Sequence, residues 1–207
     1  MTRLLLLRHA ESEWNAEGRW QGTADPPLSA RGEEQAGAAG ELVRPFGFAA
    51  VVSSDLRRAR RTAEVLAAPL GVPTAVDPGL REYDVGDWSG LTRAEIETRW
   101  PGAVDAWREG RLPSTPNGER RDAAIRRVGA ALRRVAAAHP RGPVLVVTHG
   151  GVIGALATSL GAEPARVGHL AGRWFDARPE GLAAGGAVDF LTPSDRTPAP
   201  ILDTPHR

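Results

Sequence analysis

Short apolar runs alternate with longer amphipathic segments over most of the chain. The short runs are aliphatic or β-branched and are bounded by polar or turn-forming residues, which is typical of buried strands. They predict strands at 3–8, 49–53, 74–76 and 144–148. The longer segments predict helices at 30–43, 56–67, 119–138 and 152–160. Because strands and helices alternate, we expect an α/β protein with three layers, α/β/α, and a mostly parallel central sheet.

Weaker patterns refine this outline. The third predicted helix carries an apolar stripe at three- and four-residue spacing: Ile125, Val128, Leu132 and Val135. Thr92 and Glu95 form a capping-box pattern, which predicts a short helix at 93–99. The run 186–192 predicts an edge strand, and the Pro-rich segment 193–207 has no periodicity. We therefore expect one domain over residues 1–192, followed by an extended or disordered tail over 193–207.

Composition narrows the classes of function. A chain of 207 residues with 42% hydrophobic content suits one large domain, and a net charge of +1 gives no global attraction to nucleic acid or membranes. The absence of cysteine excludes disulfides, thiolate metal sites and thiol nucleophiles. The aliphatic stretch 4–7 is too short for a signal peptide core or a membrane span. We expect a cytoplasmic protein that binds neither nucleic acid nor membrane.

Polar residues follow the predicted strands at the points where these end. His9 follows the first strand, Ser54 the second and His149 the fourth. Open α/β sheets bind ligands beyond the carboxyl ends of their strands. We therefore expect these three strand ends to meet at one site.

The residues at this edge suit phosphate chemistry. Arg8 and Arg58 each offer a planar fork of donors that matches two phosphate oxygens. Gly150 and its neighbour let the helix after His149 bring backbone N–H groups toward the same oxygens. A neutral His9 imidazole can attack phosphorus and form a phosphohistidine. The two guanidiniums and the second imidazole disfavour protonation of that ring.

Departure of an alkoxide requires a proton donor near the phosphate. Glu82, beyond the third predicted strand, is the candidate that protonates the leaving oxygen and later accepts a proton from water. Asp84, Asp87 and Glu11 remain alternatives for this role.

These residues resemble the histidine phosphatase superfamily, which includes cofactor-dependent phosphoglycerate mutases and many small phosphatases. The resemblance extends from residue 4 to about residue 160 and consists of five blocks in the expected order. These are 7–12 with Asn15; 54–59 with Thr62 and Ala63; 80–82 with Gly86, Trp88 and Gly90; 116–119; and 147–151. It implies a phosphoglycerate mutase-like fold. His9 would then be the phosphorylated histidine, with Arg8, Arg58 and His149 completing the phosphate pocket and Glu82 acting as acid and base.

The resemblance also implies residues that bind the substrate, and it implies neither a metal nor a cofactor. Asn15 adds a side-chain hydrogen bond, and the loop holding Gln21, Gly22 and Thr23 lies at the substrate mouth. Gly150, at the start of the helix after His149, is a further candidate for substrate binding. Three positions depart from the family pattern without removing a catalytic group: Ala10 for glycine, Ser89 for glutamate and Arg120 for serine. Arg120 places a long cation near the pocket entrance, where it can change substrate preference.

The segment between Trp88 and Pro116 is compact, which favours an open pocket with water as the phosphoryl acceptor. We therefore expect a metal-independent phosphatase, with a phosphoglycerate mutase and a non-catalytic phosphate-binding scaffold as alternatives. The runs 52–59, 87–92 and 101–109 resemble actinobacterial enzymes that dephosphorylate glucosyl phosphoglycerate. This favours a small-molecule substrate, a sugar or glycerate phosphate, and leaves a homodimer open.

Two further groups of residues have competing interpretations. Trp20, Trp88 and Trp107 could offer a platform for a sugar, although core packing is the commoner role of tryptophan. Paired arginines recur along the predicted helices and could form a nucleic-acid surface, but the near-neutral net charge favours solvated helix faces.

Overall fold

Alternate side chains of strand β1 (Thr2–Arg8) belong to two separate hydrophobic cores. Leu4 and Leu6 pack into one core, whereas Leu5 and Leu7 pack into the other, and all four are fully buried. Successive side chains of a strand point to opposite faces of its sheet. Both faces of the sheet are therefore covered, as expected for a three-layer fold.

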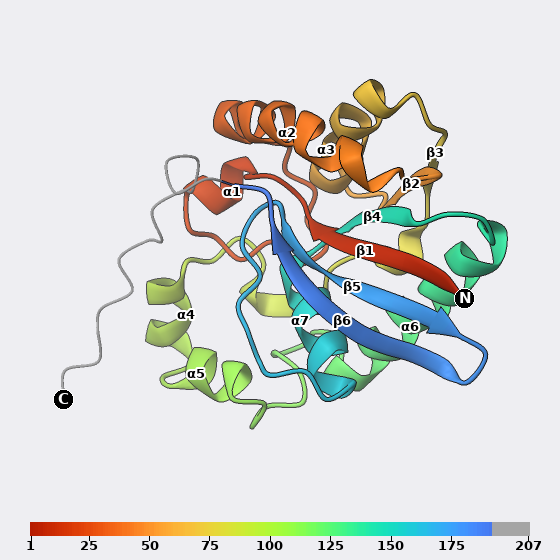
Figure 1. Cartoon of the computed structure of the whole chain (residues 1–207). Coiled ribbons are helices and arrows are strands. Elements are labelled where there is room, and N and C mark those ends of the chain that lie inside the picture. Colours follow the sequence, from red (N-terminus) through yellow and green to blue (C-terminus); the bar gives the residue numbers. More distant parts are fainter. Residues whose placement is uncertain (192–207) are drawn as a thin grey trace.

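The computed structural model describes residues 1–191 and contains a six-stranded sheet (Figure 1). The order of its strands is β3-β2-β4-β1-β5-β6. The bounds of the other strands are β2 Ala50–Ser53, β3 Thr74–Val76, β4 Val144–Thr148, β5 Ala171–Arg178 and β6 Gly181–Asp189. The first four strands pair in parallel, and β5 and β6 are antiparallel. The three-layer α/β/α fold with a mostly parallel sheet is thus confirmed, while the predicted tail 193–207 lies outside the described residues.

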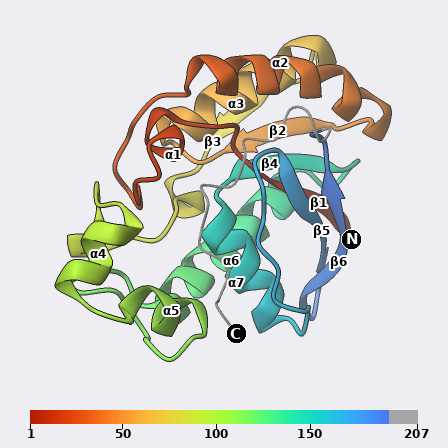
Figure 2. The same ribbon diagram turned by 90° about the vertical axis from the view of Figure 1, so that its left-hand side faces the viewer.

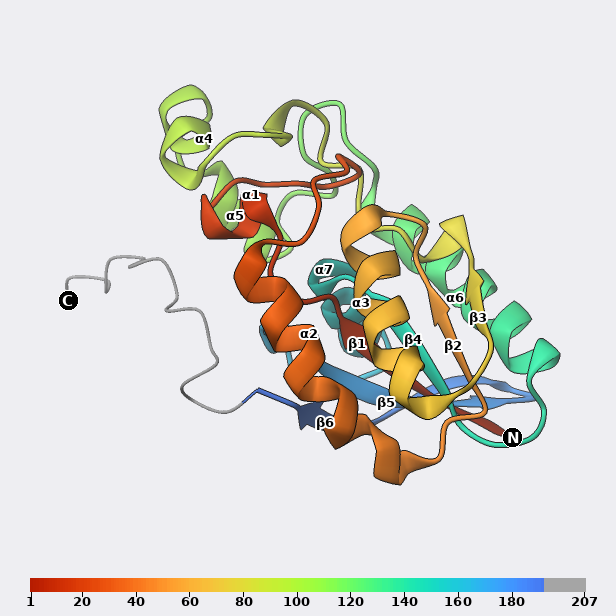
Figure 3. The ribbon, with the colours of Figure 1, turned by 90° about the horizontal axis from the view of Figure 1, so that it is seen from above.

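Helices cover the sheet on both sides (Figures 2 and 3). The helices are α1 Glu13–Ala16, α2 Ala30–Val43, α3 Arg57–Ala67, α4 Arg93–Arg99, α5 Ala103–Arg108, α6 Arg121–Ala138 and α7 Gly150–Ser159. Helices α2 and α3 contribute to the core that contains Leu5, and α6 and α7 to the core that contains Leu4. Within the predicted stripe of α6, Val128, Leu132 and Val135 are buried, whereas Ile125 is half-buried.

The structure corrects the sequence prediction at the second half of the sheet. Strand β5 was not predicted, and β6 begins at Gly181 rather than at residue 186. The β5 sequence contains three charged residues, and β6 is rich in glycine and alanine, so neither run has strong β-propensity. Pairing with β1 forms these strands, and only the tertiary structure reveals that pairing.

Short helices gather where the parallel strands end. Helices α1, α4 and α5 lie at the end of β1 opposite to the N-terminus (Figure 1). Helix α4 begins at the predicted capping box, in which Thr92 Oγ1 accepts from the Glu95 backbone N–H at 3.3 Å and Glu95 accepts from the Thr92 N–H at 2.7 Å. Helices α1 and α5 were not predicted. The sheet therefore presents its carboxyl edge to a layer of loops and short helices.

Candidate active site

His9 lies at this edge, directly after β1, and only 3% of it is exposed. Its Nδ1 lies 2.6 Å from the carbonyl oxygen of Ala10. A carbonyl can only accept, so Nδ1 carries the hydrogen and Nε2 carries the lone pair. The Nε–H of Arg58 donates to this Nε2 at 3.2 Å. The fold therefore selects one tautomer of His9.

The environment of His9 favours the neutral ring. Burial is the largest cause, and the charges of Arg58, His149 and Arg8 act in the same direction, so the pKa of His9 lies well below the ordinary value for histidine. The sequence indicated the effect of the neighbouring cations but not the larger effect of burial. A neutral imidazole with a free lone pair can act as a nucleophile at neutral pH.

Arg58 is held in place by the loop that contains Gly22. Only 1% of Arg58 is exposed, and its Nη1 and Nη2 donate to the carbonyls of Ala24 and Gly22 at 2.7 Å and 2.8 Å. A Cβ on Gly22, whose φ is +53°, would lie 2.9 Å from the Tyr83 carbonyl oxygen, so this turn requires glycine. Burial lowers the pKa of Arg58 to about 10, which still leaves it charged at neutral pH.

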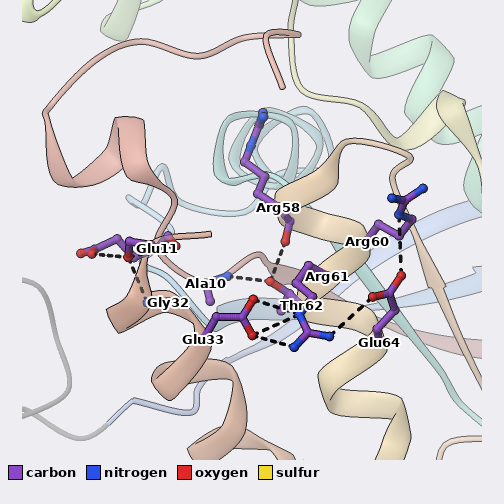
Figure 4. A network of polar contacts seen from close by, with 10 residues as sticks. Ala10, Glu11, Gly32, Glu33, Arg58, Arg60, Arg61, Thr62 and Glu64 are labelled. Carbon is purple, nitrogen blue, oxygen red and sulfur yellow. Dashed lines mark hydrogen bonds and ion pairs between the residues drawn. The ribbon is translucent and has the colours of Figure 1, made fainter. Parts of the chain in front are cut away.

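Thr62 braces Arg58 against the loop after His9 (Figure 4). Its Oγ1 donates to the carbonyl oxygen of Arg58 at 2.7 Å and accepts from the Ala10 backbone N–H at 3.2 Å. Ala10 and Arg58 come from distant parts of the chain, and one hydroxyl links their backbones. The sequence did not single out this contact.

Arg8, the residue directly before His9, lies against Gly150. Arg8 donates from Nη1 to the Val167 carbonyl at 3.0 Å, and burial lowers its pKa to about 10. A Cβ on Gly150 would lie 3.0 Å from Arg8 Cδ and 3.2 Å from the Val167 oxygen. Glycine therefore lets the start of α7 approach Arg8 closely.

His149 completes the group of predicted phosphate ligands. It is fully buried, its ring centroid lies 5.2 Å from that of His9, and the rings meet edge to face at 64°. Neither ring nitrogen has a hydrogen-bond partner within the described residues. Burial, followed by Arg58 and Arg8, lowers the pKa of His149 well below its ordinary value. Its unpaired nitrogens are available to a ligand.

Glu82 accepts hydrogen bonds from backbone N–H groups at the start of helix α7. Its Oε2 accepts from the Gly151 N–H at 2.9 Å, and its Oε1 accepts from Val152 at 3.0 Å and from Tyr83 at 3.1 Å. Backbone N–H groups at the start of this helix were expected to face phosphate, but those of Gly151 and Val152 hold the Glu82 carboxyl group at the positive end of α7. A Cβ on Gly151 would lie 2.7 Å from Glu82 Oε1, so a larger residue here would displace the Glu82 carboxyl group.

Arg127 on helix α6 fastens the segment that carries Glu82. Its guanidinium donates to the carbonyls of Gly79, Arg81 and Glu82 at 3.0, 2.9 and 3.3 Å. It also makes a paired contact with Glu119, at 3.0 Å from Nε and 2.7 Å from Nη2. In the sequence, Arg127 belongs to an arginine pair interpreted as a solvated helix face. Arg126, its neighbour, fits that interpretation, because it is exposed and pairs with Asp122.

A cavity of about 490 Å³ lies beside Glu82 and is lined by residues from four segments. These are Thr23, Pro78, Arg81, Glu82, Asp84, Asn117, Gly118, Glu119 and Arg127. Thr23, which the sequence predicted at the substrate mouth, is one of these lining residues. The departure at Arg120 lies outside this lining, and its guanidinium contacts Asp122.

Asn15 and Gln21 share one partner near the site. The Ser12 hydroxyl lies 3.0 Å from Asn15 Oδ1 and 2.8 Å from Gln21 Oε1, and Ser12 caps helix α1. Both predicted substrate-binding side chains thus anchor the loop that precedes Gly22.

The alternative acids are placed elsewhere. Glu11 Oε1 accepts from the Ser29 hydroxyl at 2.8 Å, next to the start of α2 (Figure 4). Asp87 accepts from Asn117 at 3.0 Å. Asp84 lines the cavity and accepts from the Gly86 N–H at 2.9 Å. Glu82, in contrast, is bound by the backbone at the N-terminus of α7, whose N-cap residue is His149.

The tryptophans and the paired arginines have mainly structural surroundings. Trp88 is fully buried with its ring edge-on to half-buried Trp20, and Trp107 packs under Arg121. Arg60 pairs with Glu64 within α3, and Arg61 pairs with Glu33 of the neighbouring helix α2 (Figure 4). These contacts favour core packing and solvated helix faces.

His169 was missed as a member of the site. Its ring centroid lies 6.3 Å from that of His9, and it arrives on the loop before β5. In the sequence it appeared as an isolated histidine, because β5 was not predicted. Within residues 1–191, no cluster of three or more His, Cys, Asp or Glu side chains suited to a metal ion occurs, and no helix is long and apolar enough to span a membrane.

Comparison with known proteins agrees with this geometry. The family model of the histidine phosphatase superfamily (branch 1) matches residues 4–172. Glucosyl-3-phosphoglycerate phosphatase of Mycobacterium tuberculosis is 42% identical over 166 residues, which cover 76% of this chain and 74% of that protein. A probable phosphoglycerate mutase of Salmonella arizonae is 34% identical over 226 residues and covers both chains fully.

A solved structure gives the same result. The structure of mycobacterial glucosyl-3-phosphoglycerate phosphatase in complex with VO3 matches with a TM-score of 0.81 and 34% identity, over 89% of this chain and 96% of that one. The family model spans most of the chain. The relative in Mycobacterium tuberculosis and the solved mycobacterial structure carry the same phosphatase name. The chain therefore belongs to the histidine phosphatase superfamily and is a phosphoric monoester hydrolase.

Proposed function

We propose that this enzyme hydrolyses a small phosphorylated sugar or glycerate derivative, of the glucosyl-3-phosphoglycerate type, with Nε2 of His9 as the nucleophile. The observation that carries the proposal is the state of His9: Nδ1 is fixed on the Ala10 carbonyl, and Nε2 presents a lone pair beside Arg58. The names of the relatives in Mycobacterium tuberculosis and among the solved structures support the choice of substrate.

In the first step, Nε2 of His9 attacks phosphorus and the bond from phosphorus to the leaving oxygen breaks. Arg58 moves its Nε–H from Nε2 to a phosphoryl oxygen, and Arg8 and His149 bind the other oxygens. The buried, fixed positive groups stabilise the charge on the equatorial oxygens. Glu82 gives its proton to the leaving oxygen, and the free alcohol departs.

In the second step, water attacks the phosphohistidine. Glu82 accepts a proton from the water, the bond between Nε2 and phosphorus breaks, and inorganic phosphate leaves. The neutral His9 and the protonated Glu82 are restored. The cavity beside Glu82 would hold the organic part of the substrate, since Glu82, the proposed proton donor to the leaving oxygen, lines it and its other walls are largely polar.

The first test is labelling of the nucleophile. Wild-type enzyme quenched in denaturant during turnover of ³²P-labelled substrate should carry acid-labile, base-stable label, and His9→Asn should carry none. His139→Asn, which changes a histidine at the end of α6, is the control and should behave as wild type. Label on another side chain, or full activity of His9→Asn, would refute the proposed nucleophile.

The role of Glu82 predicts a dependence on the leaving group. Glu82→Gln should reduce hydrolysis of alkyl phosphates about 10²- to 10⁴-fold, because their alkoxides need a proton. Phosphorylation of His9 by an aryl phosphate, whose phenolate leaves without a proton, should fall much less. Equal losses for both substrate classes would argue that Glu82 acts only on the fold.

A substrate panel tests specificity and the mutase alternative. The panel comprises glucosyl-3-phosphoglycerate, 3-phosphoglycerate, sugar monophosphates and a nucleotide, each with and without a chelator. We expect the highest kcat/KM for the first substrate, with no effect of the chelator. Supplying 3-phosphoglycerate with a bisphosphoglycerate primer should release inorganic phosphate, whereas accumulation of 2-phosphoglycerate would identify a mutase, the name of the Salmonella arizonae relative.

A further inference from the structure

Three buried ring nitrogens near His9 have no partner among the described residues. They are Nε2 of His169 and both nitrogens of His149. The centroids of these two rings lie 6.3 Å and 5.2 Å from that of His9. Buried polar side-chain atoms are normally hydrogen-bonded, and exceptions are explained by a ligand or water. His149 belongs to the phosphate site described above, but His169 has no role in it so far.

The register of the sheet brings His169 to this place. Strand β5 runs antiparallel to β1, and Gly172 stands opposite Leu7. One step further, the Leu170 backbone N–H donates to the Arg8 carbonyl at 3.1 Å. The residues that precede β5 must therefore lie beside the residues that follow β1. In the sheet, β5 and β2 lie on different sides of β1. His169 precedes β5, whereas Arg58 lies on the helix that follows β2. The two residues therefore approach the loop of His9 from different sides.

Backbone strain next to His169 supports a functional role. Leu170 has a φ of +50°, which is unusual for a residue other than glycine. It is fully buried, its N–H is bound by Arg8, and its carbonyl accepts from the Phe190 N–H at 3.1 Å. Strained backbone of this kind persists where the surrounding structure enforces it and occurs most often at functional sites. Here the strained residue lies between His169 and the strand that positions it.

Burial and the neighbouring charges keep the ring of His169 neutral. Burial is the largest cause, followed by Arg8 and Arg166, and together they lower the pKa of His169 to about 2. A neutral imidazole has one N–H donor and one acceptor. It can therefore donate to an anion without adding a charge beside His9. Among the groups that face it, Arg8 is the cation already assigned to phosphate.

We propose that His169 is a further phosphate-binding residue, whose Nε2–H donates to a phosphoryl oxygen of the substrate beside Arg8. This inference rests on the proposed function, because it assigns a third imidazole to the same phosphoryl group. The ligand recognised is the tetrahedral or five-coordinate oxyanion itself. Inorganic phosphate and vanadate should therefore engage His169 as well as the substrate does.

Nuclear magnetic resonance of the wild-type enzyme tests the contact directly. With ¹⁵N-labelled histidine rings, assigned through His169→Gln, titration with vanadate should shift the Nε2 resonance of His169 together with those of His9 and His149. The resonance of His139 should not move. A stationary His169 signal at saturating vanadate, with His9 and His149 shifted, would overturn the inference. Failure of the proposed function looks different, because no histidine would respond and no phosphomonoester would be hydrolysed.

Substitutions give a second measure. His169→Leu removes the donor and should weaken vanadate binding and lower kcat/KM about 10- to 100-fold, the range for a hydrogen bond to a charged group. His169→Gln places an amide nitrogen close to the position of Nε2 and should restore part of the loss. His139→Leu is the matched control. Equal effects of Leu and Gln would indicate a packing role, and if His169→Leu does not fold, the titration of the wild type still decides.

Discussion

The Nε–H of Arg58 points at Nε2 of His9, the ring nitrogen that carries the lone pair, across 3.2 Å. The other two donors of the same guanidinium are held by the carbonyls of Gly22 and Ala24. Arg58 therefore binds the nucleophile before phosphate arrives, and its guanidinium is already held beside the reacting nitrogen. Such fixed donors stabilise developing charge without having to reorganise.

Arg58 should not be replaceable by lysine. Arg58→Lys removes the contact with His9 and leaves the Gly22 and Ala24 carbonyls without their donors, because an ammonium lacks the planar fork. We expect kcat/KM for an aryl phosphate to fall about 10²- to 10³-fold. Arg57→Lys, an exposed neighbour, should have little effect. Similar kinetics for the two variants would contradict the role of Arg58.

Gly151 should be essential for the position of Glu82. In Gly151→Ala the new Cβ would meet Glu82 Oε1 at 2.7 Å and Oε2 at 2.9 Å, so the carboxylate must leave the N-terminus of α7. We expect a fall in kcat for alkyl phosphates that resembles the effect of Glu82→Gln.

Gly154 on the same helix provides the control. A Cβ there would meet only the Ala165 carbonyl oxygen, at 3.6 Å, which is an ordinary contact. Gly154→Ala should retain activity and raise the free energy of unfolding by up to about 1 kcal/mol, because alanine favours helix more than glycine does. Loss of activity in both variants would show that the defect lies in α7 as a whole.

Arg127 should affect the position of Glu82, the proposed proton donor, through the backbone that carries it. Arg127→Lys loses the paired contact with Glu119 and most of the bonds to the carbonyls of 79–82, so Glu82 becomes less well positioned. Relative to wild type, we expect kcat to fall more for alkyl phosphates than for aryl phosphates. The free energy of unfolding should fall by about 1–3 kcal/mol.

Arg126→Lys is the matched control, since Arg126 is exposed and forms an ion pair with Asp122 on its own helix. It should leave both the stability and the leaving-group dependence unchanged. An unaltered ratio of alkyl to aryl hydrolysis in Arg127→Lys, despite lower stability, would mean that Arg127 supports the fold alone.

Stability should decline in mildly acidic solution. The pKa values of His9 and His149 are lowered in the folded protein, mainly by burial, whereas in the unfolded chain histidine titrates near about pH 6.5. Below that pH the unfolded chain binds more protons than the folded protein, so the free energy of unfolding falls as pH falls. Above it both states are neutral and the contribution is complete.

Each of these two histidines should contribute a slope of up to about 1.4 kcal/mol per pH unit between about pH 6.5 and about pH 5. Urea unfolding of the wild type and of His149→Leu measures this. The variant should show the smaller slope in that interval, whatever its absolute stability. Parallel curves would show that His149 accepts a proton in the folded protein as readily as in the unfolded chain.

The sequence by itself determined the layers and most of the active edge. Hydrophobic runs such as 3–8 and 144–148 predicted the central strands, because strands buried on both faces are apolar throughout. The polar residues that end these strands, His9 and His149, could be assigned to one edge because parallel strands share their direction. The predicted site therefore rested on topology and on local motifs.

Tertiary structure decided which groups lie in contact. The carbonyl of Ala10 that fixes the tautomer of His9, the hydroxyl of Thr62 and the guanidinium of Arg127 gain their roles from neighbours distant in the chain. Strand β5, which brings His169 to the site, has no strong pattern of its own and forms by pairing with β1. Local patterns report which face of an element is buried, whereas contacts between elements depend on register and burial that only the folded chain defines.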